Sequence, residues 1–238
     1  MTAILRRELS AYFFSPIGYV FLSVFYLVSG IFFFVFCVFS NSTDLTPVFS
    51  FLFYIVLFLI PILTMRLLSE DKKHKTDQAL LTAPVSLAGL VLGKFLAALV
   101  VFLMGLSVVL VFALIIAGFT TPNWPSVFGN FFAILLLGAA LISVGMLMSS
   151  LTENQVVAAV LAFFINLALM LVDVLAGMFH NMFANPIVGN LMLQMSYFTR
   201  YNNFTTGKFD LSDALFFLSA TAIFVFLTVR VLEKRRWS

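Results

Sequence analysis

The chain has 238 residues, of which 63% are hydrophobic and only 10% are charged, and its formal net charge is +3. This composition, with a mean hydropathy of +1.13, excludes a disordered chain and an ordinary water-soluble domain. The apolar runs do not alternate with polar residues, so a β-barrel is disfavoured and an all-α integral membrane protein is predicted. The basic residues cluster at the ends of the apolar runs, which favours a role in membrane topology over nucleic-acid binding.

The N-terminal part predicts a surface helix followed by two membrane-spanning helices. Residues 1–15 mix charged side chains with leucines and aromatics, which is typical of an amphipathic helix lying at the membrane surface. Its charged residues are Arg6, Arg7 and Glu8. About 20 apolar residues cross a bilayer, and the runs 17–39 and 47–67 meet this requirement. The second run contains Pro61, which removes a backbone donor, so we expect a kink near Leu57–Pro61.

The longest charged stretch of the chain lies in the segment 69–84, directly after the second span. Ser69 suits the N-cap position of a helix, and the acidic residues after it suit the positive end of the helix dipole. The segment ends with two leucines, which a solvated loop does not need. We therefore expect a surface helix that docks another protein, and the alternative is a positively charged loop that only sets topology. The candidate docking residues are Glu70, Asp71, Lys72, Lys73, Lys75, Thr76, Leu80 and Leu81.

The rest of the chain predicts four more spans and one broken region. Between Phe95 and Thr152 there is no Asp, Glu, Lys or Arg, and only the turn cluster 120–125 interrupts the apolar run. The predicted spans are 89–117, 127–149, 156–176 and 211–231. The region 177–210 is apolar but broken by Asn, Gly and Pro, which fits outer re-entrant or interfacial half-helices better than a full span.

The distribution of Lys and Arg predicts the orientation. With six spans, eleven of the 13 basic residues fall on the side of the two termini, and only Arg200 and Lys208 fall on the other. The positive-inside rule therefore predicts that both termini and the segment 69–84 are cytoplasmic. A seventh crossing through 177–199 would put the basic C-terminus outside. We expect a multi-pass protein of the inner (plasma) membrane.

The chain offers little chemistry of its own. We find no Walker-type phosphate loop, since the run ending at Lys94 is one residue short and Phe95 replaces the Ser or Thr that would hold magnesium. We predict neither a catalytic set nor a metal site. Inside the spans, Asn166 and Asp173 are seven residues apart and share one helix face. With Pro61 they are candidates for a pathway or gating role, the alternative for Asp173 being an interfacial or packing role.

Three segments, in this order, resemble ABC-2-type transporter permeases. The first runs from Arg66 to Phe95 and contains an acidic residue, a Thr, a Leu-Leu pair, Pro-Val and Gly-Lys-Phe. The second is the polar connection 149–155, with the sequence Ser-Ser-Leu-Thr-Glu-Asn-Gln. The third, 228–237, resembles the gliding-motility-type subgroup of ABC permeases. The similarity extends over nearly the whole chain.

The resemblance implies a six-helix permease that pairs with a second permease copy and binds cytoplasmic ABC ATPase subunits. ATP and magnesium would bind those subunits, and no cofactor is expected on this chain. The resemblance also implies that residues 70–81 form the coupling helix, that 1–15 is the connecting helix in contact with membrane lipid, and that 177–210 holds the outer re-entrant helices. An extracytoplasmic accessory subunit is compatible with it. We expect an exporter, and the scarcity of charge suits an amphipathic or lipid-like cargo.

Other functions stay open at this point. A secondary transporter or channel needs a site for a coupling ion, for which Asp173 is the only good candidate. A non-transporting membrane assembly protein would bind partners without stimulating an ATPase. A membrane-embedded enzyme is less favoured, because no carboxylates or metal ligands cluster at one interface.

Overall fold

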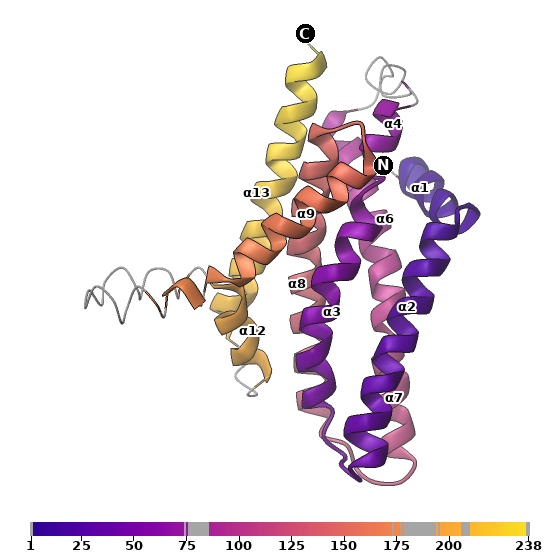
Figure 1. The fold of residues 1–238 in the computed structure, drawn as a ribbon, viewed down its shortest axis with the longest axis vertical. Helices are drawn as coiled ribbons and strands as arrows, with labels where there is room; N and C mark the ends of the chain where they lie inside the picture. Colours follow the sequence, from indigo (N-terminus) through magenta and orange to yellow (C-terminus); the bar gives the residue numbers. More distant parts are fainter. Residues whose placement is uncertain are drawn as a thin grey trace.

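A computed structural model describes residues 2–73, 75, 86–172, 174–176, 178, 194, 196–205 and 210–236. Across these ranges the chain is helical and contains no strand, as the composition predicts. The elements are α1 (Thr2–Phe14), α2 (Pro16–Phe33), the π-helical η1 (Phe34–Phe39), α3 (Thr46–Thr64), α4 (Ser69–Lys73), α6 (Leu87–Leu106), α7 (Val108–Ala117), α8 (Trp124–Leu151), α9 (Gln155–Met170), α12 (Tyr197–Thr205) and α13 (Leu211–Arg236). They form an elongated bundle (Figure 1).

Five helical stretches among the described residues are long and apolar enough to cross a membrane. They are Pro16–Phe39, Thr46–Lys73, Leu87–Ala117, Trp124–Leu151 and Leu211–Arg235. Each overlaps one of the six predicted spans. The remaining predicted span, 156–176, corresponds to α9, which has 16 residues and runs obliquely to the long helices (Figure 1). About 20 residues are needed to cross, so the sixth crossing stays a prediction.

Helix α8 is the centre of the bundle, since it contacts α3, α6, α9, α12 and α13. In its most apolar window 83% of the residues are buried, against 61% or less in the other spans. Small residues make this possible, because they let helix backbones approach closely in a membrane. A Cβ on Gly138 would lie 2.1 Å from the ring of Phe102 in α6, and a Cβ on Gly145 would lie 2.1 Å from Oγ1 of Thr64 in α3.

Stacked phenylalanines join the first helices of the chain, which explains part of the high Phe content. The rings of Phe33 and Phe112 stack at 4.4 Å between α2 and α7. The rings of Phe32 and Phe51 stack at 4.6 Å between α2 and α3. Offset aromatic pairs of this kind contribute roughly 0.5–1.5 kcal/mol beyond their burial.

Pro61 lies inside α3, and the kink expected near Leu57–Pro61 stays a prediction. Helix α3 continues through Pro61 to Thr64, and the backbone N–H of Met65 still donates to the Pro61 carbonyl at 2.9 Å. A turn over 65–68 then separates α3 from α4. A proline is tolerated inside such a helix because neighbouring helices re-satisfy the freed backbone.

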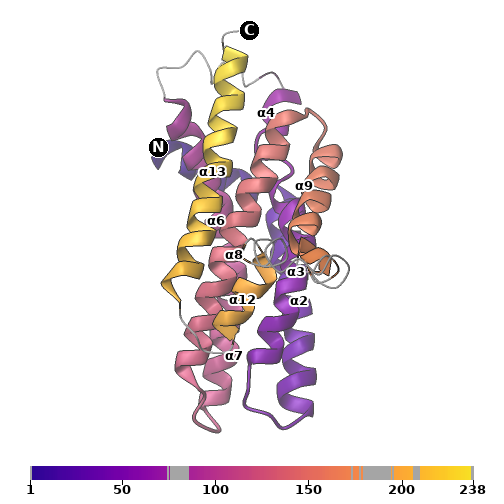
Figure 2. The same cartoon turned by 90° about the vertical axis from the view of Figure 1, so that its left-hand side faces the viewer.

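Both termini lie toward the same end of the bundle as α4, and the connections 40–45 and 118–123 lie at the other end (Figures 1 and 2). This arrangement agrees with the prediction that the two termini share one side of the membrane. The charged residues gathered at that end form the candidate site.

Candidate coupling site

The centre of the site is a buried lysine between two carboxylates. Nζ of Lys94 lies 2.7 Å from Oδ2 of Asp71 and 3.0 Å from Oε1 of Glu8. The Lys94 side chain is only 2% exposed, and those of Asp71 and Glu8 are 16% and 11% exposed. Buried lysines are rare unless they are paired. The three residues, which we call the Lys94 cluster, come from α6, α4 and α1 and join these helices.

Helix geometry brings the three side chains together. Helix α6 begins after Ser86, whose side chain caps it by accepting a hydrogen bond from the Gly89 N–H at 3.2 Å. Lys94 follows two turns later, on the buried face of the helix. Glu8 and Tyr12 are four residues apart on α1, and both face the bundle.

Arg7 extends the Lys94 cluster toward solvent. Its guanidinium donates to Oε1 of Glu8 at 2.7 Å and lies 3.8 Å from Oδ1 of Asp71. Burial alone would lower the pKa of Arg7, but the hydrogen bond to Glu8 and the charges of both carboxylates outweigh it and raise the pKa. A cavity of about 280 Å³ opens beside the cluster. It is lined by Arg7, Glu8, Ala11, Arg66, Glu70, Asp71 and Lys94.

A second set of contacts fixes the C-terminal half of α1 to the end of α3. The Tyr12 hydroxyl donates to the Leu63 carbonyl at 2.8 Å, and burial raises the pKa of this phenol. Arg66 lies over the Tyr12 ring at 5.5 Å and donates to Oγ of Ser15. Arg66 also pairs with Glu70 at 2.8 Å. Helix α1 is therefore attached at both of its halves to the segment that leads into α4.

The end of α8 holds the turn between α3 and α4. Oγ of Ser149 accepts hydrogen bonds from the N–H groups of Leu68 and Ser69, both at 3.0 Å, and donates to the Met65 carbonyl at 3.0 Å. Lys72 is 5% exposed and donates to the Ser150 carbonyl. The polar segment 149–155 thus has a structural partner, and we call these contacts the α8 seat.

Sequence reasoning located this region but not its internal contacts. Ser69 begins α4, but its hydroxyl donates back to the Met65 carbonyl instead of capping the helix. Asp71 and Lys72 point into the protein, whereas the side chains of Lys73 and Lys75 are exposed. Glu70 is half-buried. Of the other docking candidates, Thr76, Leu80 and Leu81 lie outside the described residues.

The two described pathway candidates lie on α3 and α9, and the N-terminal candidates lie on α1. Pro61 is buried in α3. Asn166 is fully buried in α9, and neither the nitrogen nor the oxygen of its amide has a hydrogen-bond partner among the described residues. Asp173 lies outside the described residues, so the predicted face shared with Asn166 is not tested. On α1, Glu8 faces inward, whereas Arg6 and Arg7 are exposed.

Lys94 and Ser149 belong to the candidate site, and sequence reasoning did not select them. The signal for Lys94 was its position, a lone charge inside the apolar run of the third span. The signal for Ser149 was the polar connection at the end of α8. Glu8 is 86 residues from Lys94 in sequence, Asp71 is 23 residues from it, and the partners of Ser149 are 80 to 84 residues away, so no local pattern reveals these contacts.

The fold and the site together define a multi-pass helical membrane protein with a buried charge cluster at the end where both termini lie. The sequence profile of the family described as "ABC-2 family transporter protein" matches residues 31–237, and the chain belongs to this family. It is therefore a transmembrane permease of the ABC-transporter type, a membrane component without catalytic activity of its own. Permeases of this family typically pair with an ABC ATPase. No curated protein matches the chain.

Proposed function

We propose that this chain is the permease subunit of an ATP-driven exporter, in which two permease copies work with separate cytoplasmic ATPase subunits. ATP and magnesium would bind those subunits. Family membership supports the permease role. The position of α4 at the end of the bundle where the basic C-terminal residues lie supports a cytoplasmic contact there.

The observation that carries the proposal is the Lys94 cluster. Force applied to α4 by an ATPase would reach α6 through Asp71 and Lys94, and α1 through Lys94 and Glu8. Separating these charges inside the protein costs about 3–5 kcal/mol of free energy, because each charge would remain buried without its partner. The three helices therefore move as one unit when α4 is pushed.

The contacts of the α8 seat would also transmit a displacement of α4 directly to α8. The Ser149 hydroxyl accepts hydrogen bonds from two backbone N–H groups at the turn before α4, and Lys72 donates a hydrogen bond to the Ser150 carbonyl. Helix α8 contacts α3, α9 and α13, so a displacement of α4 would be distributed to most of the bundle. We propose that this distribution reorients the spans for transport.

The docking surface follows from what the inner contacts leave available. Asp71 and Lys72 are used within the permease and Glu70 pairs with Arg66, which leaves the exposed Lys73 and Lys75 as the charges most available to the ATPase. Leu80 and Leu81 would fill an apolar groove on that partner, while the charges set the register. The unpartnered amide of Asn166 supports a polar pathway or a contact with the second permease copy.

Co-expression of the tagged chain with an ABC ATPase from the same genome tests this proposal. The ATPase should be retained on the wild-type permease, and retention should fall at least tenfold in the Leu80→Asp/Leu81→Asp variant. Thr43→Asp/Thr121→Asp, at the opposite end of the bundle, adds the same charges as a control and should retain it. Equal retention by both double variants would contradict docking at 69–84.

A further inference from the structure

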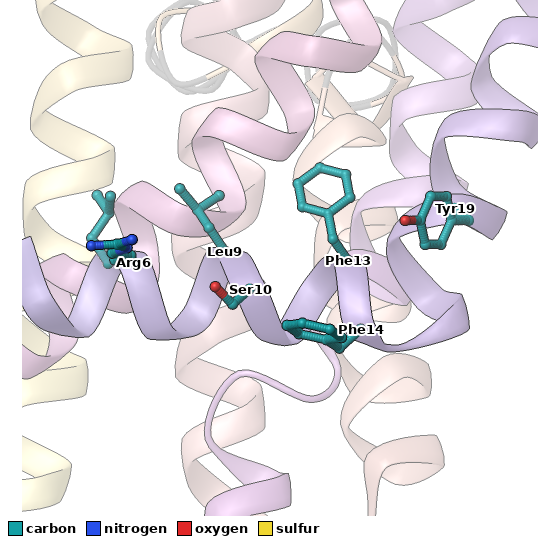
Figure 3. A pocket seen from close by; sticks show the side chains of 7 residues that line it. Arg6, Leu9, Ser10, Phe13, Phe14 and Tyr19 are labelled. Carbon is teal, nitrogen blue, oxygen red and sulfur yellow. The ribbon is translucent and has the colours of Figure 1, made fainter.

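A groove runs along the outer side of α1, away from the contacts of the candidate coupling site. Its lining residues are Leu5, Arg6, Leu9, Ser10, Phe13, Phe14 and Tyr19, and they enclose about 500 Å³ (Figure 3). All but Tyr19 belong to α1, and Tyr19 comes from the first turn of α2. The groove therefore lies in the corner where α1 meets the first span.

Two rows of side chains on α1 shape the groove. Leu5, Leu9 and Phe13 are spaced four residues apart and are half-buried, so they form an apolar floor. Arg6, Ser10 and Phe14 form the parallel row and are exposed. The Phe13 ring meets the Tyr19 ring edge-on at 5.9 Å, which closes one end of the floor.

The exposure of the aromatic rings indicates what surrounds the groove. Phe14 is 92% exposed and Tyr19 is 57% exposed. The first span begins at Pro16, between these two residues, so both rings lie at the level where a bilayer would begin. Aromatic side chains concentrate at this interface because their apolar bodies contact acyl chains there.

Arg6 and Arg7, which are neighbours in sequence, differ in whether a carboxylate lies close enough to pair with them. Arg7 contacts the carboxylates of Glu8 and Asp71. Arg6 projects to the groove, and no described carboxylate lies within ion-pair distance of it. The positive charge at the rim is thus available to an anion, and guanidinium groups bind phosphate with paired hydrogen bonds. The Ser10 hydroxyl, one turn away on the same row, adds a second donor.

We infer that this groove binds one anionic phospholipid from the leaflet at which α1 lies. The Arg6 guanidinium and the Ser10 hydroxyl contact its phosphate, and an acyl chain covers the apolar floor formed by Leu5, Leu9 and Phe13. A free phosphate would leave that floor exposed to water, whereas a lipid satisfies both parts of the groove. The lipid secures α1 on the membrane surface while the Lys94 cluster holds its other face.

Native mass spectrometry of the purified full chain, titrated with phosphatidylglycerol or phosphatidylcholine, tests this inference. Wild type should bind one phosphatidylglycerol in preference to phosphatidylcholine. Arg6→Gln should weaken phosphatidylglycerol binding about fivefold, the effect of one basic residue near a membrane surface. Phe13→Ser should weaken the binding of both lipids. Arg235→Gln removes the same charge from the exposed end of α13 and should change neither.

Four results would overturn the inference. They are equal binding of the two lipids by wild type, equal effects of Arg6→Gln and Arg235→Gln, displacement of the lipid by soluble glycerol phosphate, and displacement by a bound ATPase. The third would identify a phosphate site, and the last would assign the groove to the protein partner. The lipid titrations use the permease alone and only the displacement by an ATPase needs the complex, so a failure of lipid binding would leave the proposed transport function intact.

Discussion

The ammonium group of Lys94 lies 2.7 Å from the carboxylate of Asp71, and this contact joins the start of the third apolar stretch to α4, at the end of the second. The same ammonium reaches Glu8 at 3.0 Å. A single side chain thus connects the N-terminal helix to the segment we propose as the ATPase-docking site.

Replacing Lys94 with Met should strongly destabilise the protein, because the carboxylates of Glu8 and Asp71 would remain buried near each other without a cation. We expect the free energy of unfolding in detergent to fall by about 3–5 kcal/mol. The variant Glu8→Gln/Asp71→Asn/Lys94→Met, which removes all three charges, should recover most of this loss. Equal stabilities of the single and triple variants would argue against unpaired charge as the cause.

Ser149→Ala should loosen the turn between α3 and α4. The substitution removes the acceptor of two buried N–H groups, so we expect a loss of about 1–3 kcal/mol in the free energy of unfolding. Ser143→Ala is the matched control on the same helix, because within the described part of the chain the Ser143 hydroxyl donates to the Ala140 carbonyl of α8 and to no other group. Denaturant titration of both variants checks this. If Ser143→Ala lowers the free energy of unfolding as much as Ser149→Ala does, the hydrogen bonds of the α8 seat do not contribute more to stability than an ordinary buried serine.

Gly145→Ala should destabilise the contact between α8 and α3. The new methyl group would meet Thr64 Oγ1 at 2.1 Å, and overpacking of this kind costs roughly 1–3 kcal/mol. A Cβ on Gly129, also on α8, would meet no described atom within 4 Å outside its own stretch of helix, so Gly129→Ala should be neutral or slightly stabilising. Thermal unfolding of the two variants in detergent distinguishes them, and similar midpoints would refute the close approach.

Asp213→Asn should weaken the attachment of α12 to α13. Asp213 accepts hydrogen bonds from Arg200 at 2.8 Å and from Asn203 at 2.9 Å, and its side chain is 5% exposed. Loss of its charge leaves Arg200 partly buried without a counter-ion, for which we expect about 3 kcal/mol of destabilisation. Glu233→Gln breaks the exposed pair with Arg230 and should change little. Melting temperatures that shift equally would contradict this ranking.

Hydropathy predicted the long helices because a chain in lipid must satisfy its own backbone hydrogen bonds, so long apolar runs have few alternatives to helix. Hydropathy did not predict where α9 ends. The run 156–176 is apolar apart from Asn166 and Asp173, yet the regular helix ends at Met170 after 16 residues. Helix ends set by tertiary packing leave little trace in composition.

The site was predicted in part for a similar reason. A run of charges identifies a polar segment, but not which of its side chains turn inward. Asp71 and Lys72 pair with residues more than 20 positions away in sequence, and their neighbour Lys73 stays exposed. The tertiary contacts with α6 and α8 decide this difference, and a single sequence contains no record of them.

Hydrogen–deuterium exchange of α1 in the permease–ATPase complex tests the central claim most directly. If the Lys94 cluster transmits movement from the docking segment, adding a non-hydrolysable ATP analogue should change the exchange of residues 2–14 in the wild type. That response should be lost in Glu8→Gln/Asp71→Asn/Lys94→Met, although the ATPase still binds. An equal nucleotide response of α1 in the triple variant would contradict the account.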